Sequence, residues 1–591
     1  MKENPRHLSI LGMLLALSCC LLLSQSAPAP AHPLVTDSSY DYDSSATAEC
    51  LAEPGSTAYK GGIIVNPEFS NSTAGWTVFG KGAIELRRSP ESNVFMVALH
   101  RKASRDSFSQ RVFLEEGNHY SFSAWIQVSK GTEAVAAMFR TSEGVFVSGG
   151  SVVANQGCWS LLKGGIFANS SGPADVLFES RNTSIDLFID NVSLQPFSKK
   201  QWRSHQDERI KKVRKSEVTF RVIDCNGTEV RGAIISVKQT KTEFPFGCGL
   251  NFHILDSEEY RNWFSARFKY TTFTNSMKWY STEVKRGIEN YAVADAMVAF
   301  AEENGIRIRG HNIFWDDPKY QPEWVKTLSG EELRAAAERR INSVVTRYNG
   351  RLIAWDVVNE NLHFSFFEDK LGKNTSAAYF STAYSLDPSS RMFMNEYNTI
   401  EYSGDVTAGP SNYLKRLKGI LTYPGNDRLL PGIGVEGHFG QGQPNLAYIR
   451  SSLDILATAG IPIWMTEVDV GKGPGQDEYL EQVLREGFSH PAVEGIIMFA
   501  GPESAGFNVT TLADRNFKNT PAGEAVDRLI EEWRTGSFET RTDDQGSFKT
   551  ALYHGEYEIR VENPVWRSST VTKVEVKKAL RGRTIDIKIG P

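Results

Sequence analysis

The chain has 591 residues, 40% of them hydrophobic and 23% charged, with a formal net charge of −5. This length is too great for one domain and predicts three or four, and the composition is that of a globular protein. The weak negative charge excludes nucleic-acid binding as the main role, because that role favours a strongly basic surface.

The N-terminus has the layout of a secretory signal peptide. Lys2 and Arg6 precede an apolar run, Leu8–Leu23, and small residues that suit cleavage follow at 26–31. We therefore predict a signal peptide over residues 1–31. An uncleaved anchor is the alternative, but the run of 16 residues is short for a membrane span. No later segment has the required apolarity, so no stable membrane association is expected.

Glycosylation motifs and cysteine usage also favour the secretory route. Asn-x-Ser/Thr motifs begin at Asn71, Asn169, Asn182, Asn191, Asn226, Asn374 and Asn508. The cysteines beyond the signal peptide are Cys50, Cys158, Cys225 and Cys248, an even number in an oxidising route. Of the possible pairings we favour Cys50–Cys158 and Cys225–Cys248, because each bond would then stay within one domain. No cysteine or histidine motif suggests a metal site, and no cofactor is expected.

The first third of the chain is predicted to contain a disordered lead-in and a β-rich module. Residues 32–60 are rich in Ser, Asp, Thr and Pro, which predicts a poorly ordered segment. Residues 61–197 show short alternating runs, such as His119–Val128 and Glu133–Phe139, broken by Gly, Asn and Ser. This pattern predicts an antiparallel, jelly-roll-like β-sandwich.

A basic segment, residues 198–215, follows the sandwich and carries eight Lys or Arg with few apolar positions. The pattern favours a solvated basic linker, which could form a short helix. A patch that binds a polyanion, such as an acidic wall polysaccharide, is the alternative.

The longest region, residues 244–535, alternates strand-like and helix-like segments. The strand-like segments lie near 245–251, 271–279, 307–315, 352–360, 391–398, 431–439, 461–470 and 493–501. The helix-like segments include Tyr291–Asn304, Glu331–Tyr348, Tyr413–Leu421, Ala447–Ala459 and Asp477–Ser489. This alternation predicts an α/β fold of the (β/α)8 TIM-barrel type. An open doubly wound sheet is the alternative, but the sequence lacks the Gly-rich phosphate turn that such a sheet usually has after its first strand.

The barrel region is flanked by two short β-rich segments, residues 216–243 and 536–591. Neither has enough strands to bury both faces of a sheet by itself. The first contains Asp224-Cys-Asn-Gly-Thr-Glu-Val and the second Thr542-Asp-Asp-Gln-Gly-Ser-Phe, and together they resemble the halves of a transthyretin-like sandwich. We predict one small discontinuous β-sandwich with the barrel inserted between its halves, because barrel termini lie close together.

Two buried strands of the predicted barrel end in carboxylic acids. One strand ends in Glu360, and another carries Glu467 and Asp469. A barrel presents catalytic groups at the carboxyl ends of its strands, and two carboxyls are the minimum for cleaving a glycosidic bond. His438, at the end of the sixth strand, could donate to Glu467 and be oriented by Asp469. The alternative is structural, since a strand-end acid can also cap the next helix.

Six motifs, each on a predicted barrel strand, carry a family resemblance. They are Phe273-Thr-Asn-Ser-Met-Lys-Trp, Arg309-Gly-His, Trp355-Asp-Val-Val-Asn-Glu, Asn395-Glu-Tyr-Asn, Gly432-Ile-Gly-Val-Glu-Gly-His-Phe and Trp464-Met-Thr-Glu-Val-Asp. In their order and sequence, residues 245–500 resemble glycoside hydrolase family 10, the endo-β-1,4-xylanases, in its plant cell-wall branch. The resemblance implies a retaining mechanism with Glu360 as proton donor and acid/base and Glu467 as nucleophile.

The same resemblance assigns the residues that hold the sugar. Asn359 would bind the 2-hydroxyl of the reacting sugar, and further contacts would come from Asn275, Lys278, His311, Trp315 and Tyr397. Four positions depart from the residues common in the family: Thr274, Asp316, Glu436 and Phe499 stand where Glu, His, Gln and Trp are usual. These departures leave the catalytic pair intact and surround the sugar-binding residues.

The N-terminal sandwich resembles carbohydrate-binding module family 22. The opening Asn66-Pro-Glu-Phe and the closing Asp190-Asn-Val carry the resemblance, and they mainly set up the sandwich. Glu179 lies where that family places a ligand-binding acid. Trp76, Trp125 and Trp159 are expected in the core rather than on a sugar platform.

The leading functional prediction is a secreted endo-1,4-β-xylanase, monomeric, that acts on xylan in the plant cell wall or apoplast. A xylan endotransglycosylase is the alternative among enzymes, because it shares the first half-reaction. A xylan-binding wall protein with little turnover is the alternative outside enzymes. Nucleic acid is not an expected partner.

Overall fold

A computed structural model of the protein describes residues 41–565 and 567–590. The predicted signal peptide, 1–31, and the first part of the predicted lead-in lie outside these residues. From Tyr42 onward the chain forms one unit by its internal contacts. No helix in the described ranges combines the length and apolarity that a membrane crossing requires.

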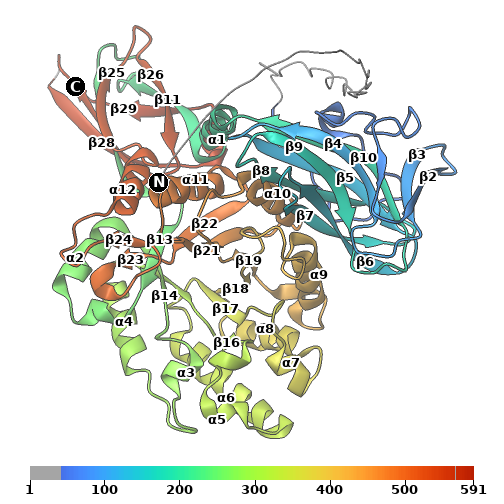
Figure 1. The fold of residues 1–591 in the computed structure, drawn as a ribbon. Coiled ribbons are helices and arrows are strands. Elements are labelled where there is room, and N and C mark those ends of the chain that lie inside the picture. The colour runs from blue at the N-terminus through green and yellow to red at the C-terminus, as the bar shows by residue number, and fades with distance from the viewer. Residues whose placement is uncertain (1–40, 566, 591) are drawn as a thin grey trace, which may run out of the picture. The chain divides into compact units, whose positions relative to one another are not determined.

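Residues 77–197 fold into the N-terminal module, a sandwich of two antiparallel sheets with strand orders β1-β4-β9-β6-β7 and β2-β3-β10-β5-β8 (Figure 1). The strands are β1 (Thr77–Phe79), β2 (Ala83–Arg88), β3 (Val94–Leu99), β4 (Ser107–Leu114), β5 (His119–Val128), β6 (Thr132–Arg140), β7 (Phe146–Asn155), β8 (Ser160–Phe167), β9 (Gly172–Glu179) and β10 (Leu187–Phe197). Alternation along each strand turns one set of side chains into the shared core, as predicted. Trp76, Trp125 and Trp159 are buried, as expected.

The predicted cysteine pairing is half right. Cys50 and Cys158 form a disulfide with their Cα atoms 5.4 Å apart. The second predicted bond is wrong, because Cys225 is exposed while Cys248 is buried in the barrel wall, where its Sγ donates to the carbonyl of Ala500. Both of these thiols are free.

The predicted disorder of residues 32–60 is wrong from Tyr42 onward. The Tyr42 ring is buried against Trp202, and its hydroxyl donates to Asp454 Oδ2 at 2.8 Å. Cys50 and Leu51 are tied to the module by the disulfide and by a bridge to Trp159. The Ser- and Asp-rich composition did not reveal these anchors.

The predicted basic linker is a well-capped helix, α1 (Lys199–Arg214). Ser198 and Gln201 form a capping box at its start. Trp202, Gln206 and Ile210 are four residues apart, so they share one buried face, and the basic residues occupy the others. The indole of Trp202 donates to Glu486 Oε2 at 2.9 Å, which fixes α1 against a barrel helix.

The barrel is closed and parallel, which confirms the predicted fold class. Its strands are β13 (Phe246–Leu250), β14 (Tyr270–Phe273), β15 (Arg307–Gly310), β16 (Phe314–Trp315), β17 (Ala354–Asn359), β18 (Arg391–Glu396), β19 (Pro431–Val435), β20 (His438–Phe439), β21 (Ile463–Val470) and β22 (Val493–Met498). Within the described residues, β16 continues β15 and β20 continues β19, so the ten segments form eight barrel strands. The pairing of β15 with β17 closes the barrel.

Helices cover the outside of the barrel (Figure 1). They are α2 (Glu258–Arg267), α3 (Trp279–Thr282), α4 (Ala292–Glu303), α5 (Glu323–Lys326), α6 (Gly330–Tyr348), α7 (Phe366–Leu371), α8 (Thr375–Leu386), α9 (Pro410–Leu421), α10 (Leu446–Ala457), α11 (Gln476–Ser489) and α12 (Pro521–Glu532). Buried apolar residues of these helices and of the strands form the largest core cluster. Because the barrel strands are all parallel, their carboxyl ends lie at one face of the barrel.

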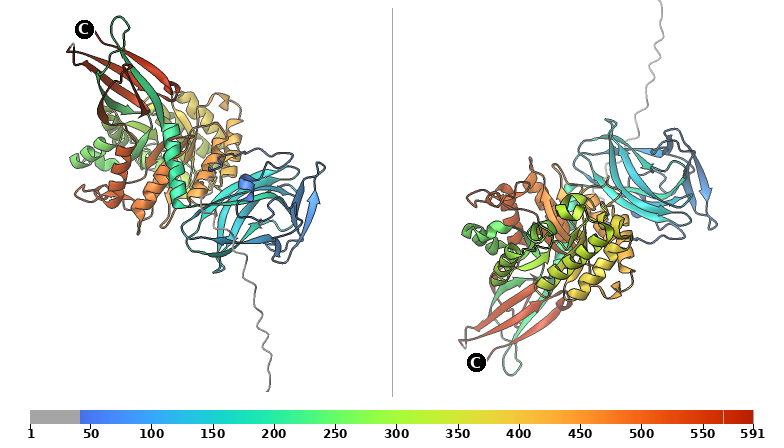
Figure 2. Two further views of the ribbon diagram at one scale, coloured as in Figure 1. Left: turned by 90° about the horizontal axis from the view of Figure 1, so that it is seen from above. Right: turned by 90° about the horizontal axis from the view of Figure 1, so that it is seen from below.

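The two segments that flank the barrel form one sandwich, as predicted. Their strands are β11 (Lys215–Ile223), β12 (Ile234–Thr242), β25 (Ser537–Arg541), β26 (Ser547–Tyr553), β27 (Gly555–Asn563), β28 (Ser568–Val576) and β29 (Arg583–Lys588). β11 lies between β26 and β29, and β12 lies between β25 and β27. The green early strands and the red late strands stand side by side in Figure 2 and share one core.

A buried ion pair joins the module to the barrel. Lys163 Nζ on β8 lies 2.9 Å from Asp454 Oδ2 on α10, and both side chains are at most 5% exposed. Burial alone would raise the pKa of Asp454, but Lys163 and His490 outweigh it and lower the pKa to about 2. The carboxylate thus adds stability above its unfolded pKa near 4, and this stability is lost as the pH falls toward 2.

We expect Lys163→Met to lower the free energy of unfolding by about 3–5 kcal/mol at neutral pH, because it leaves the Asp454 carboxylate buried without its ammonium partner. Urea denaturation measures this change. Lys549→Met is the matched control, because it removes an exposed pair with Glu217 and should change stability by less than about 1 kcal/mol. Equal effects of the two substitutions would contradict the assigned role of the pair.

Candidate active site

Glu360 and Glu467 meet at the open face of the barrel. Glu360 directly follows β17, and Glu467 lies within β21; they are only 8% and 5% exposed. Glu360 has a φ of +58°, a left-handed conformation that costs a non-glycine residue roughly 1–2 kcal/mol. Its backbone N–H donates to the carbonyl of Asn395 at 2.9 Å, which holds this turn. Such strain is typical of functional positions.

Two asparagines link the carboxyls. Asn359 Nδ2 donates to Glu360 Oε1 at 3.3 Å, and Asn395 Nδ2 lies 2.9 Å from Asn359 Oδ1 and 3.0 Å from Glu467 Oε1. Thr466 donates to Asn395 Oδ1 at 2.6 Å and so fixes the orientation of that amide. Asn395 belongs to one of the sequence motifs, but only the folded structure shows that it lies between the two carboxyls.

Two histidines and a lysine surround Glu467. His438 Nε2 lies 3.5 Å from Glu467 Oε2, and His438 Nδ1 lies 3.0 Å from Asp469 Oδ2. His311 Nε2 is 3.8 Å from the other oxygen of Glu467. Burial alone would raise the pKa of Glu467, but His311, His438 and the nearby Lys278 outweigh it and hold the pKa well below its ordinary value. Glu467 is therefore ionised at neutral pH.

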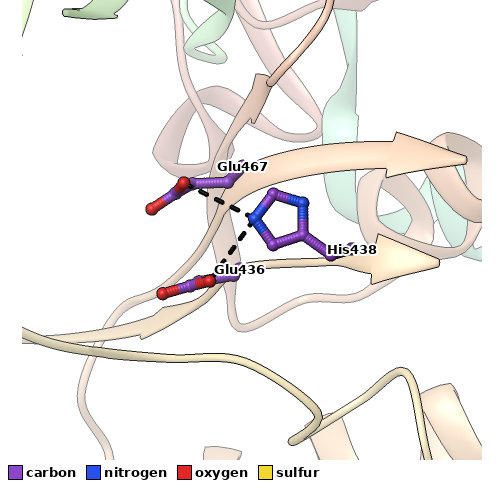
Figure 3. A group of neighbouring side chains, drawn as sticks. All are labelled: Glu436, His438 and Glu467. Carbon is purple, nitrogen blue, oxygen red and sulfur yellow. Dashed lines mark ion pairs between the residues drawn. The ribbon is translucent and has the colours of Figure 1, made fainter. Parts of the chain in front are cut away.

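Glu436 shares His438 with Glu467. Figure 3 shows the three side chains pointing toward one another from adjacent strand ends, with His438 Nε2 3.4 Å from Glu436 Oε2. Burial, with repulsion from Glu467, raises the pKa of Glu436 well above its ordinary value and so favours the neutral form of this acid. A neutral carboxyl can donate a hydrogen bond as an amide does, which explains how Glu can stand where Gln is usual in the family.

The same three residues are the described group best placed to hold a metal, since their ligand atoms lie within 4.8 Å of one another. A histidine must be neutral to ligate a metal. Burial disfavours the imidazolium of His438, but hydrogen bonds with Asp469, Glu436 and Glu467 raise its pKa well above the ordinary value. The protonated ring is therefore suited to a charge-stabilising role rather than to metal binding.

Glu360, in contrast to the ionised Glu467, is favoured in its protonated form. Burial, with added repulsion from Glu396 and Glu467, raises the pKa of Glu360 to about 8. A carboxyl with this pKa keeps its proton at neutral pH and can donate it to a leaving group. One hollow thus contains a protonated carboxyl and an ionised one, the two states that glycosidic cleavage requires.

The pH profile should reflect this separation. We expect kcat/KM to fall as the pH rises through about 8, because Glu360 then loses the proton that it must donate. The acid limb should lie below pH 4.5, the ordinary value for a glutamate, because Glu467 stays ionised well below it. Initial rates on xylan between about pH 4 and pH 10 test this. An alkaline limb near pH 5 would contradict the assigned protonation of Glu360.

The sugar-binding residues predicted from the sequence line one hollow of about 370 Å³ with the two carboxyls: Asn275, Lys278, His311, Trp315, Asn359 and Tyr397. His438, predicted as a donor to Glu467, lines the same hollow. Lys278 Nζ lies 3.3 Å from Asn275 Oδ1 and 4.2 Å from the ring centre of Trp315. His311 is oriented by Asp356, whose Oδ2 lies 2.8 Å from His311 Nδ1. Asp469, which was predicted to orient His438, contacts that ring at Nδ1 but does not line the hollow.

Further lining residues were not assigned a role from the sequence. Tyr320 stacks on Trp315 at 4.0 Å and 13°, and Asp317 and Phe364 also line the hollow. His363 stacks beneath Tyr397 at 3.9 Å and is held between Glu396 and Asp405 by contacts of 2.7 and 2.8 Å. The sequence signal for these residues was their nearness to motif residues, which does not reveal where their side chains point.

The departures from the family pattern have different consequences. Asp316 does not line the hollow: it is fully buried and accepts the backbone N–H of Phe367 at the start of α7. Thr274 is buried and does not line the hollow. Glu436 and Phe499 do line it, and the Phe499 ring lies 5.9 Å from that of His438. The altered chemistry is therefore concentrated around His438.

The module residue and the glycosylation motifs lie outside this hollow. Glu179 ends β9 and accepts from Arg105 Nε at 2.9 Å. Five of the motif asparagines are exposed: Asn71, Asn169, Asn226, Asn374 and Asn508. Asn182 and Asn191 are half-buried, and their Nδ2 atoms donate to Glu133 and to the carbonyl of Gly55, each at 2.6 Å. The exposed five are better suited to carry a glycan.

Comparisons with known proteins found a family model, curated relatives and solved structures that resemble this chain. The family model "Glycosyl hydrolase family 10" matches residues 236–526. Endo-1,4-beta-xylanase 5-like from Arabidopsis thaliana is 46% identical over 554 residues, covering 92% of this chain and 93% of that protein. Endo-1,4-beta-xylanase 4 from the same plant is 43% identical, covering 91% and 92%. The crystal structure of the CBM22-1–GH10 modules of Clostridium thermocellum xylanase 10B with xylohexaose is 17% identical, covers 78% of this chain and 95% of that one, and has a TM-score of 0.42.

Proposed function

The chain belongs to glycosyl hydrolase family 10, and on this premise we propose that it is a secreted, retaining endo-1,4-β-xylanase acting on cell-wall xylan. The observation that carries the proposal is the position of Glu360 and Glu467 in one hollow, where burial raises the pKa of Glu360 and nearby basic groups lower that of Glu467. The names of the plant relatives, endo-1,4-beta-xylanases, support the substrate class.

In the first step the ionised Glu467 attacks the anomeric carbon while Glu360 gives its proton to the leaving glycosidic oxygen. A covalent bond forms between the sugar and Glu467, and the bond to the leaving chain breaks. His438 and His311 hold Glu467 ionised before the attack, and Asn359 lies beside Glu360, where it can bind a hydroxyl of the reacting sugar.

In the second step Glu360, now ionised, removes a proton from water as the water attacks the same anomeric carbon. The bond to Glu467 breaks, and both carboxyls return to their starting states. Two inversions at one carbon restore the original configuration. If the hydroxyl of another xylan chain replaces the water, the same step transfers the chain instead of hydrolysing it.

The wall location is part of the proposal. The signal-peptide layout of residues 1–31 and the exposed glycosylation motifs support secretion. Xylan of the plant wall is the polymer that a secreted plant enzyme with this site would meet.

Product analysis tests the proposed function. The full-length protein is incubated with linear β-1,4-xylan and a fluorescent xylo-oligosaccharide acceptor. A rise in reducing ends with short oligosaccharides is expected, and label that moves into polymer would instead identify a transglycosylase. Unchanged polymer, or activity that survives Glu467→Ala, would contradict the proposal.

A further inference from the structure

His363 is a histidine beside the catalytic hollow that the proposed mechanism does not use. It lies on the loop after β17, three residues beyond Glu360, and its side chain is 13% exposed. Its Nδ1 lies 2.7 Å from Glu396 Oε1, and its Nε2 lies 2.8 Å from Asp405 Oδ2. Because both ring nitrogens face carboxylates and the side chain does not line the hollow, any part that His363 has in the reaction is indirect.

The ring of His363 is held as a cation. Only the imidazolium form can donate from both nitrogens at once, and here both nitrogens face a carboxylate oxygen. Burial alone would lower the pKa of His363, but hydrogen bonds with Glu396 and Asp405 outweigh it and raise the pKa to about 9. Removing one member of a buried pair is costly, so the three side chains fix one another.

The two acids belong to the next strand of the barrel and its loop. Glu396 ends β18, and Asp405 lies on the loop that follows it. His363 therefore ties the loop after β17 to the loop after β18. Glu396 strengthens this link, because its Oε2 accepts the backbone N–H of Leu362 at 2.8 Å and its Oε1 accepts that of Tyr397 at 3.1 Å. One loop begins with the proton donor and the other with Tyr397, and both line the hollow.

The ring of Tyr397 lies flat on the ring of His363. Their centres are 3.9 Å apart, and their planes are 14° from parallel. In the part of the chain that the structure describes, the Tyr397 hydroxyl has no hydrogen-bond partner, and no other aromatic ring contacts the side chain. The next residue is fixed separately, since Asn398 Nδ2 donates to Asp405 Oδ2 at 2.9 Å. The acids thus hold the backbone of this loop, and the stack on His363 orients the ring.

A flat wall at a fixed angle favours binding of a sugar. A cation over the face of an aromatic ring is attracted to it, so this stack resists rotation of the Tyr397 ring. A wall that is already oriented avoids much of the ordering cost of binding. Because such a wall contacts the sugar both before and during bond cleavage, its loss should weaken substrate binding more than it slows the chemical step.

We propose that His363 is a positioning residue for xylan cleavage: clamped between Glu396 and Asp405, it holds the ring of Tyr397 as a fixed wall of the catalytic hollow. The effect on cleavage rests on the proposed function. His363 lies outside the six motifs that carry the family resemblance, and the sequence gave it no role.

Two substitutions in the full-length protein test the parts of this clamp. His363→Leu keeps a similar volume but removes the charge and the flat face. His363→Arg keeps both, because a guanidinium is planar and cationic, stacks on aromatic rings and can bond carboxylates. His554→Leu is the matched control, since His554 is 12% exposed and its Nδ1 lies 3.5 Å from Glu243 Oε2, outside the hollow.

For His363→Leu we expect KM on xylohexaose to rise by roughly 3–10-fold, the effect of losing one aromatic contact, while kcat stays within about twofold of the wild type. His363→Arg should return KM to within about twofold of the wild type. His554→Leu should leave both constants unchanged. A loss of folded protein would lower the apparent kcat and not raise KM.

An unchanged KM in His363→Leu, or a His363→Arg enzyme with the KM of His363→Leu, would overturn the inference. Should His363→Leu fold too poorly for assay, His363→Gln takes its place with the same expected rise in KM, because the amide keeps one hydrogen bond but lacks the charge.

A double variant tests whether His363 acts through Tyr397. Tyr397→Leu alone should raise KM by a similar factor. Adding His363→Leu to it should raise KM by less than about twofold more, because the ring through which His363 acts is then absent. A full second rise would show that His363 acts through another group, which also overturns the inference.

Crystal structures of the wild type and of His363→Leu, both without substrate, separate this inference from the proposed function. Displacement of the Tyr397 ring in the variant supports the positioning role even if the wild type cleaves no xylan. A ring that keeps its place overturns the inference and leaves xylan cleavage by Glu360 and Glu467 standing.

Discussion

Replacing Glu467 with Gln is expected to lower kcat on xylan by about 10⁴-fold or more, because the variant has no carboxylate to form the bond to the sugar. The amide preserves the size of the side chain, so the protein should fold normally. Initial-rate measurements with reducing-end detection quantify the loss.

The matched control for this prediction is Glu478→Gln, which changes an exposed carboxyl on α11, the helix that follows β21. Its activity should equal that of the wild type. A Glu467→Gln enzyme with activity within about tenfold of the control would show that another group is the nucleophile.

Replacing Glu360 with Ala is expected to lower kcat on xylan by roughly 10²–10⁴-fold, the usual contribution of a general acid. The loss has a chemical signature. An aryl xyloside with an acidic phenol needs little protonation of its leaving group, so formation of the glycosyl–enzyme should be nearly as fast as in the wild type. Pre-steady-state release of the phenol measures this step.

Azide supplies the second half of the test. Without Glu360 the second step lacks its base, but azide is a nucleophile that needs no deprotonation. Added azide should therefore restore turnover of Glu360→Ala on the aryl xyloside and yield a β-xylosyl azide. Turnover that azide does not raise would contradict the acid/base role of Glu360.

The barrel could be predicted because its strands and helices carry period and length signals along the chain. Tertiary contacts are harder to foresee. The segment with α1 looked solvated because Lys and Arg dominate it, yet Trp202 and Gln206 are buried against Glu486, a residue 280 positions away from Gln206. Likewise, only the fold reveals that Asp454 lies within reach of Tyr42.

In the candidate site, too, position along the chain could be predicted but tertiary contacts could not. Strand-end position and family motifs single out Glu360 and Glu467, because a barrel presents chemistry at its strand ends. The sequence does not show where a side chain points. Asp316 and Asp317 are adjacent, but Asp316 is buried against α7 and Asp317 lines the hollow. The separation of the two pKa values depends on burial and on the positions of His311, His438 and Lys278, which only the folded structure specifies.

The central claim is that Glu360 and Glu467 act in a double displacement, and the configuration of the first product tests it most directly. Proton NMR during hydrolysis of xylohexaose distinguishes the α- and β-anomers of the new reducing end before they equilibrate. The account predicts that the β-anomer appears first, because two inversions restore the starting configuration. Initial formation of the α-anomer would contradict it.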